Sequence, residues 1–181
     1  MQLDKYMYQE TERLILRRLK ASDAQAIYKF RNNRDNFPFL DISTYSVIEE
    51  AVDYINRCNI NIDQNNFLLY GIELKKTSEC IGTIALWNFS DDKKTVELGY
   101  ILFQGFQNQG YMIEAAGKAI EVAKTLEVDL IEAFTHKYHF RSIQMLEKLG
   151  FQYERTYFET DTHTSKLLPL VVYQFKTFKP L

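Results

Sequence analysis

Proline, glycine and cysteine are scarce in this chain, with three, seven and two residues among 181. So few breakers, and no low-complexity tract, leave no stretch that resembles a linker between domains. We therefore expect one domain over residues 1–181, a length that suits a single hydrophobic core. Cys58 and Cys80 lie among apolar residues and have neither the number nor the spacing of a disulfide framework or a metal site. We expect two buried thiols and no metal.

Long hydrophobic runs and an excess of charge of one sign are also missing. No apolar run approaches the roughly 20 residues of a membrane-spanning helix, and residues 1–5 do not resemble a signal peptide. The formal net charge is -2, whereas binding to nucleic-acid phosphates relies on clustered Lys and Arg. We expect a cytoplasmic protein with no membrane and no nucleic-acid partner.

The hydrophobic pattern predicts a mixed α/β domain. Apolar residues make up 46% of the chain, enough for a substantial core. Alternating or continuous apolar runs predict strands, and apolar residues at helical spacing predict helices. In chain order, we expect a strand at 13–18, helices after Ser22 and Ser46, strands at 67–74, 80–89 and 96–103, a helix opened by Gly110, a strand at 130–135, a helix stopped by Gly150, and strands at 151–158 and 168–178.

The order of these elements predicts a mixed sheet. Short polar segments separate the three central strands, so we expect them to form an antiparallel meander. The alternation of strands and helices that follows indicates a sheet covered by helices. The last two strands would form a hairpin around the polar segment Thr160–Lys166.

The connection between the strand at 96–103 and the helix after Gly110 is the segment most typical of a ligand site. The first amides of a helix have no internal partner and lie at the positive end of its dipole, so such a turn can hold a pyrophosphate. An ordinary strand–helix connection would have the same pattern. The segment does not match the phosphate loop of ATP-binding proteins or the dinucleotide motif Gly-x-Gly-x-x-Gly, so ATP and NAD are poorly supported.

Three segments, in the right order and spacing, resemble the GNAT superfamily of N-acetyltransferases. Gln107–Met112 resembles its pyrophosphate loop, Q/R-x-x-G-x-G/A, and Ser142–Phe151 resembles its second signature, N-x-x-S-x-x-x-L-E-K-L-G-F. Thr11–Arg17 is similar to the opening of the branch that contains the ribosomal-protein N-terminal (alanine/serine) acetyltransferases. The resemblance runs from Thr11 to Phe175, nearly the whole chain.

This resemblance implies the GNAT fold, with a mostly antiparallel sheet that splays between the fourth and fifth expected strands, 96–103 and 130–135. Acetyl-CoA would enter the gap, where the first of these strands pairs with the pantetheine arm and the loop amides hold the pyrophosphate. The implied cofactor-binding residues are Tyr100, Ile101, Leu102, Gln107, Asn108, Gln109, Gly110, Tyr111, Met112, His139, Arg141 and Ser142.

Two residues depart from the family pattern. Met112 stands where the loop usually has Gly or Ala, so its side chain lies beside the phosphates or turns into the core. His139 stands where the second signature usually has Asn. Histidine also donates and accepts hydrogen bonds, but it differs from Asn in shape and charge.

Acetyl transfer to an amine needs a base for the ammonium and an acid for the departing thiolate. The resemblance implies that Ser142 is the acid and Glu97 the base, although Ser142 could instead cap its helix and Glu97 could be a solvated surface charge. His136 and His163 are further proton-transfer candidates, and Glu114 is expected to stabilise a helix N-terminus rather than contact substrate.

The acceptor amine stays open between a protein N-terminus and a small molecule such as a polyamine, an amino acid or an antibiotic. The acceptor pocket would be formed by the first two helices, including Arg31–Pro38, and by the terminal hairpin. We expect direct transfer within a ternary complex, by a monomer or a homodimer. A non-catalytic acyl-CoA-binding module is the third hypothesis, because Met112 and His139 depart from the pattern.

Overall fold

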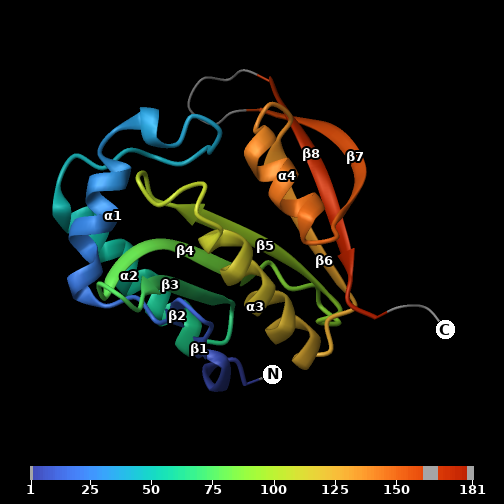
Figure 1. Cartoon of the computed structure of the whole chain (residues 1–181), viewed down its shortest axis with the longest axis horizontal. Helices are drawn as coiled ribbons and strands as arrows, with labels where there is room; N and C mark the ends of the chain where they lie inside the picture. The colour runs from blue at the N-terminus through green and yellow to red at the C-terminus, as the bar shows by residue number, and fades with distance from the viewer. Residues whose placement is uncertain (1, 161–166, 179–181) are drawn as a thin grey trace.

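A computed structural model describes residues 2–160 and 167–178 of the chain. Its strands form one eight-stranded sheet in the order β1-β2-β3-β4-β5-β6-β8-β7 (Figure 1). β5 and β6 are parallel, and the other neighbours are antiparallel. The mixed, mostly antiparallel sheet and its central meander are therefore confirmed. The strands are β1 Tyr8–Glu10, β2 Leu14–Arg17, β3 Leu68–Leu74, β4 Glu79–Trp87, β5 Thr95–Leu102, β6 Leu130–His136, β7 Gln152–Thr160 and β8 Leu167–Lys176.

Helices cover both faces of the sheet, and each pair of helices encloses a core of its own. One core lies under α3 and α4, and the other lies under α1 and α2 (Figure 1). The helices are α1 Ala24–Arg31, α2 Ile48–Asp63, α3 Tyr111–Thr125 and α4 Phe140–Lys148, with short 3₁₀ helices η1 Asp4–Tyr6, η2 Ala21–Asp23 and η3 Arg34–Asn36.

The spacing of apolar residues in α3 matches the face that the helix buries against the sheet. Apolar residues at helical spacing form one buried face of the helix, and its four alanines, Ala115, Ala116, Ala119 and Ala123, are fully buried. Alanine combines high helix propensity with a small side chain, so the helix packs close to the sheet. Burial of this face, rather than helix propensity, accounts for most of the stability of such a helix.

The sheet splays between β5 and β6. Backbone pairing joins these strands at Thr95, Val96 and Glu97, whose partners are Leu130, Ile131 and Glu132. Beyond Glu97, β5 continues to pair with β4, while β6 pairs with β8 up to His136. The splay that the family resemblance implied is therefore present, and it leaves one backbone edge of 100–102 without a neighbouring strand of the sheet.

A buried ion-pair cluster ties β2 to η2 and β3. The Arg17 guanidinium binds Asp23, with Nη1 2.8 Å from Oδ2, and donates from Nε to the carboxylate of Glu73. Burial alone would lower the pKa of Arg17, but the hydrogen bonds to Asp23 and Glu73 hold it above its ordinary value. The charge is therefore paired on both sides, as a buried cation requires.

One strand was absent from the expected element order. β1 was not predicted, because Tyr8–Glu10 is a three-residue edge strand with an exposed pattern; it pairs with β2. The terminal hairpin is confirmed, since β7 pairs antiparallel with β8. The segment 161–166 of the expected connection, including His163, lies outside the described residues.

Candidate active site

Two hydroxyl groups meet at the splay. Tyr100 Oη, from β5, lies 2.7 Å from Ser142 Oγ, in the first turn of α4. Burial raises the pKa of Tyr100 to about 12, although the bond to Ser142 opposes this shift. Ser142 lies inside α4, whose N-cap is His139, so Ser142 is not the N-cap of its helix. The pair places two hydrogen-bonded hydroxyls, one buried and one partly buried, beside the unpaired edge of β5.

The loop between β5 and α3 has the backbone geometry of an anion site. Asn108 and Gly110 have φ values of 62° and 79°, in the left-handed region, and α3 begins at Tyr111. Left-handed turns direct successive amides to one side and form concave anion sites, and the first amides of α3 add to them. A β-carbon on Gly110 would lie 3.3 Å from Arg13 Nη2, so a side chain there would be both strained and crowded.

Arg13, which directly precedes β2 and is distant from this loop in sequence, holds the loop in place. Its Nη1 donates to the carbonyl of Gln109 (2.9 Å), its Nε binds Glu114 Oε2 (2.6 Å), and its guanidinium lies 4.6 Å from the centre of the Tyr111 ring. Burial would raise the pKa of Glu114, but hydrogen bonds from Thr11 and Arg13 keep it below its ordinary value. Glu114 thus anchors Arg13 beside the helix N-terminus. Sequence reasoning missed this role of Arg13, although the residue lies in the Thr11–Arg17 motif.

Of the two residues that depart from the family pattern, Met112 lies in the core and His139 lies at the site. Met112 is 7% exposed and packs in the core under α3, so its side chain turns away from the loop. His139 stays at the site, where its Nδ1 lies 3.4 Å from Thr135 Oγ1 and its ring stacks on Phe39 at 4.7 Å. Burial lowers the pKa of His139, and the charges of Arg141 and His136 lower it further. His139 is therefore a neutral imidazole at pH 7.

Arg141 joins the two motif segments across the splay. Its Nη1 donates to Gln107 Oε1 at 3.1 Å, and Gln107 Nε2 in turn donates to the carbonyl of Leu102 at 3.4 Å. The start of α4, the loop and the end of β5 thus form one connected group. The residues expected at the cofactor are brought together, apart from the side chain of Met112.

Glu97 projects from the opposite face of the sheet. Alternation along β5 places Glu97 and Ile101 on the side of α1 and α2, and Tyr100 on the side of α3 and α4. Burial raises the pKa of Glu97, the hydrogen bond from Asn88 Nδ2 (2.5 Å) opposes the shift, and the charges of Glu132 and Glu159 add to it. A carboxylate with a raised pKa on the face opposite the hydroxyl pair suits a base, with the acid on the other side of the gap.

A cavity of about 190 Å³ lies between the segment that follows η3 and the strands β6, β7 and β8. This segment continues directly from the expected acceptor residues Arg31–Pro38, so the cavity lies one to three residues further along. His136 lines it, with a pKa lowered by burial and an Nδ1 that accepts from the amide of Tyr138 at 3.2 Å. Its lining consists of Phe39, Leu40, Asp41, Phe134, Thr135, His136, Glu159, Leu168 and Leu170.

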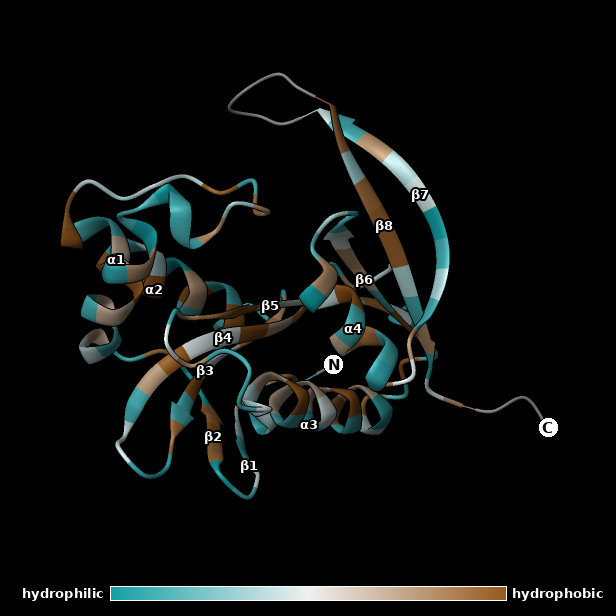
Figure 2. Cartoon of the chain, turned by 45° about the horizontal axis from the view of Figure 1, so that its top comes forward, coloured by the Kyte–Doolittle hydropathy of each residue, from teal (hydrophilic) through white to brown (hydrophobic). Residues whose placement is uncertain are grey.

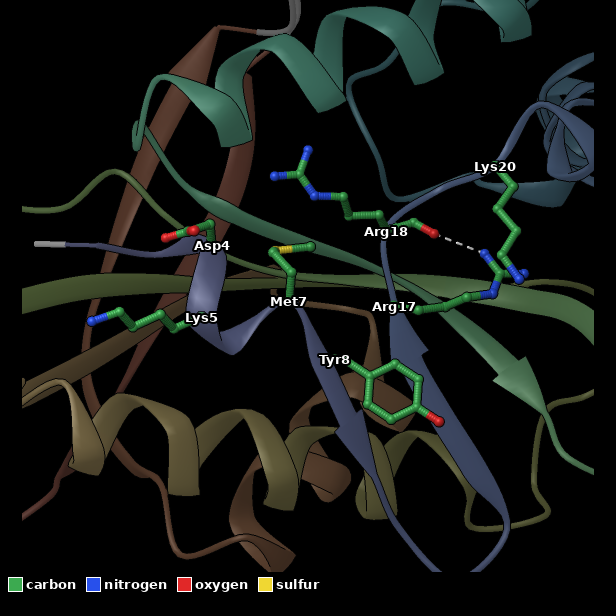
Figure 3. A pocket seen from close by; sticks show the side chains of 7 residues that line it. All are labelled: Asp4, Lys5, Met7, Tyr8, Arg17, Arg18 and Lys20. Carbon is green, nitrogen blue, oxygen red and sulfur yellow. Dashed lines mark hydrogen bonds between the residues drawn. The ribbon is translucent and has the colours of Figure 1, made fainter.

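A second cavity, of about 380 Å³, lies between the N-terminal segment and β2 (Figure 3). Its basic side chains are largely engaged: Arg17 binds Asp23 and Glu73, and Arg18 Nη1 lies 2.7 Å from Asp63. Lys20 Nζ is 3.7 Å from Glu73. None of the residues of the splay lines this cavity, so we do not assign the chemistry to it.

Within residues 2–160 and 167–178, no group of three or more His, Cys, Asp or Glu side chains is arranged to hold a metal ion. In the same part of the chain, no helix has the length and apolar character needed to span a bilayer. Cys58 and Cys80 are buried free thiols, as expected, and burial raises the pKa of both, to about 12 for Cys80.

Comparison with known proteins gives the family. The model of the acetyltransferase (GNAT) domain matches residues 13–152. The uncharacterized N-acetyltransferase YoaA of Bacillus subtilis (strain 168) is 28% identical over 146 residues, which cover 80% of this chain and 82% of YoaA.

Solved structures share the fold. The ribosomal-protein-S5-alanine acetyltransferase from Vibrio fischeri superposes with a TM-score of 0.81 at 20% identity, over 96% of this chain and 99% of that one. The spermidine N-acetyltransferase from Vibrio cholerae, in complex with CoA and spermine, gives a TM-score of 0.79 at 18% identity, over 92% of this chain and 97% of that one. With the domain match covering most of its length, the chain belongs to the GNAT acetyltransferase family.

Proposed function

We propose that this protein is an acetyl-CoA-dependent N-acetyltransferase that acts on a primary amine. The observation that carries the proposal is the splay after Glu97, which places the Tyr100–Ser142 hydroxyl pair between the loop before α3 and the start of α4. Enzymes of this chemistry need a site for the cofactor, a base and an acid within one cleft. All three have candidates at this gap.

The residues at the gap suit acetyl-CoA. The left-handed turn at Asn108 and Gly110, followed by the first amides of α3, would hold the pyrophosphate. Arg13 adds a positive charge beside this loop. The free backbone edge of 100–102 would pair with the amide groups of the pantetheine arm, as an added strand does. When bound, acetyl-CoA supplies an acetyl group activated as a thioester.

The positions of acid and base support direct transfer across the gap. Glu97, on one face, would take the first proton from the protonated amine, either directly or through water, and free its lone pair for attack. Ser142 Oγ, on the other face, would donate a proton toward the leaving sulfur, while the second amine proton replaces it through the relay. In this relay Tyr100 would pass its proton to Ser142 and take the second amine proton, and its pKa of about 12, above the roughly 8.5 of a thiol, means that both hydroxyls end the cycle protonated.

A covalent acetyl-cysteine route has little support. Cys58 and Cys80 are buried, and their raised pKa values keep both as thiols, whereas the thiolate is the nucleophile. Transfer within a ternary complex is therefore the mechanism that we propose. Radiolabelled acetyl that stays on the denatured protein as a thioester would contradict it.

Two classes of acceptor remain candidates within this function. Fold neighbours include an enzyme named for a ribosomal protein and one named for spermidine, and fold alone does not choose between their substrates. A non-catalytic acyl-CoA-binding module is the alternative outside enzymology. The core position of Met112 removes one reason for that alternative.

The test is release of free CoA thiol from acetyl-CoA by the full-length protein, with a panel of amines and short peptides. Turnover that depends on the amine, with acetylated amine identified by mass spectrometry, would establish the activity. Tight acetyl-CoA binding without amine-dependent turnover would instead favour the binding module.

A further inference from the structure

One wall of the cavity beside β6 is mostly apolar, and it consists of side chains on one face of neighbouring strands. Phe134 and His136 project from β6, and Leu170, the sheet partner of His136, projects from β8 on the same face. Leu168 and its partner Glu159 on β7 continue this face outward. In Figure 2 the segment that connects α1 to α2 extends toward these strands, and β8 is mostly coloured as hydrophobic.

The opposite wall comes from the segment between η3 and α2, which contributes Phe39, Leu40 and Asp41. The Phe39 ring contacts both histidines of the site, at 5.3 Å from the centre of His136 and 4.7 Å from that of His139. His139 is the N-cap of α4, whose first turn carries Ser142. Through Phe39 and His139, the lining of the cavity therefore reaches the N-terminus of the helix that carries Ser142.

We propose that this cavity binds a compact apolar group of the acceptor amine, of the size of one phenyl ring or one branched butyl group. The proposal rests on the acetyltransferase function proposed above and specifies its substrate class. Apolar cavities of about 150 Å³ bind benzene, and this one measures about 190 Å³. Five of its lining residues are apolar: Phe39, Leu40, Phe134, Leu168 and Leu170.

The charges around the cavity favour an amine with a single positive charge. The reacting ammonium has to reach Glu97, so only the remainder of the acceptor enters the cavity. Of the two lining carboxylates, Glu159 is exposed, where water and salt weaken its charge, and Asp41 already has an interaction within the protein. Glu97 and Glu132 lie outside the lining and accept hydrogen bonds from Asn88 and Gln174. A second ammonium inside the cavity would lose its water among apolar side chains without gaining a buried partner, which is unfavourable. Linear polyamines are therefore disfavoured.

The same chemistry occurs in two sources, free arylalkyl or branched alkyl amines and peptides that begin with Phe or Leu. The full-length protein is assayed with acetyl-CoA and 2-phenylethylamine, isoamylamine, putrescine and spermidine, and with matched peptides that begin with Phe or Ser. We expect kcat/KM for the apolar monoamines or the Phe peptide to exceed that for putrescine by about tenfold or more. Turnover of the free apolar amines would identify a small-molecule acceptor, and turnover of the Phe peptide would identify a peptide N-terminus.

A matched pair of variants tests the cavity itself. Leu168→Trp adds an indole inside the cavity, whereas Leu167→Trp adds it to the adjacent, exposed position of β8, where the side chain is 66% exposed. Leu168→Trp should raise KM for the preferred amine by about tenfold or more, with acetyl-CoA affinity unchanged. Leu167→Trp should stay within about twofold of wild type.

A second variant covers the case in which Leu168→Trp does not fold. Phe39→Ala enlarges the cavity from a half-buried loop position, so it should raise the ratio of kcat/KM for tryptamine over that for 2-phenylethylamine. Equal turnover of putrescine and the apolar amines overturns the cavity proposal and leaves the acetyltransferase function intact. The same holds if folded Leu168→Trp leaves KM unchanged, or if folded Phe39→Ala leaves the ratio of kcat/KM for tryptamine over 2-phenylethylamine unchanged. Failure to turn over any amine overturns both.

Discussion

The hydroxyl of Tyr100 lies 2.7 Å from that of Ser142, although 42 positions separate the two residues in the chain. The contact joins the part of β5 that lies beyond the splay to the first turn of α4. It gives each hydroxyl a hydrogen-bond partner, and in the proposed mechanism the two residues act as one unit. Removing either one should therefore disable the same relay.

We expect Ser142→Ala and Tyr100→Phe each to lower kcat by roughly 100-fold, the lower range for loss of a positioned proton donor. The double variant should be little slower than either single variant, because groups that act as a unit are not additive. Steady-state kinetics with the best amine of the panel measures this, and calorimetry with acetyl-CoA controls for cofactor binding. Independent, multiplying effects would show that the two hydroxyls do not act together.

Glu97 should control the acid side of the pH profile. A base works only when ionised, and the pKa of Glu97 is raised above its ordinary value of 4.5. The kcat/KM should therefore fall as the pH drops through this raised pKa, and Glu97→Gln should both lower kcat/KM and remove that fall.

Asn88→Ala provides a sharper version of this test. The hydrogen bond from Asn88 lowers the pKa of Glu97, so its removal should move the acid limb to higher pH. Glu79→Gln, at an exposed carboxylate at the start of β4, should leave the profile unchanged. If neither Glu97→Gln nor Asn88→Ala changed the pH dependence of kcat/KM, the base would be another group, such as the neutral imidazole of His136 or His139.

Arg13 should act on cofactor affinity rather than on chemistry. Arg13→Gln removes the ion pair with Glu114 and the charge beside Gln109, so the Kd for acetyl-CoA should rise by about 5- to 30-fold, equivalent to 1–2 kcal/mol. The matched variant Arg18→Gln breaks the ion pair with Asp63 and should leave the Kd unchanged. If Arg13→Gln lowered kcat at saturating acetyl-CoA instead, the residue would have a role in the reaction step.

The buried cluster of Arg17, Asp23 and Glu73 should matter for stability. Glu73→Gln leaves the Arg17 charge with only one of its two carboxylate partners. Breaking a buried ion pair in this way costs about 3–5 kcal/mol, measured as the free energy of unfolding in urea. The exposed control Glu79→Gln should stay within about 0.5 kcal/mol. Equal stabilities for the two variants would mean that Asp23 alone satisfies Arg17.

The strongly periodic elements could be predicted from the sequence. Helix α3, with its buried alanines, and the meander β3–β5 follow directly from the spacing of apolar residues. The splay and the cofactor loop came from the family resemblance, because nothing in the spacing of apolar residues indicates where two parallel strands separate. β1 was missed because three exposed residues at a sheet edge carry no alternation.

The contacts that define the site could not be predicted from the sequence. Arg13 meets Glu114 across 101 positions, and Phe39 stacks on His139 from a segment without a motif. Such contacts depend on how separate elements pack, which local pattern does not encode. The position of the Met112 side chain could not be predicted either. The sequence allowed it to lie beside the phosphates or in the core, and the packing of α3 places it in the core.

Cofactor binding at the loop before α3 is the claim on which the whole account depends. The measurement is calorimetric titration of acetyl-CoA into the wild-type protein, Gly110→Asp and the control Gly117→Asp, whose new side chain would enter open space on α3. We predict micromolar binding by the wild type and the control, and none by folded Gly110→Asp, because it places a carboxylate where the pyrophosphate should lie. Absence of binding by the wild type, or unchanged binding by Gly110→Asp, would contradict the account.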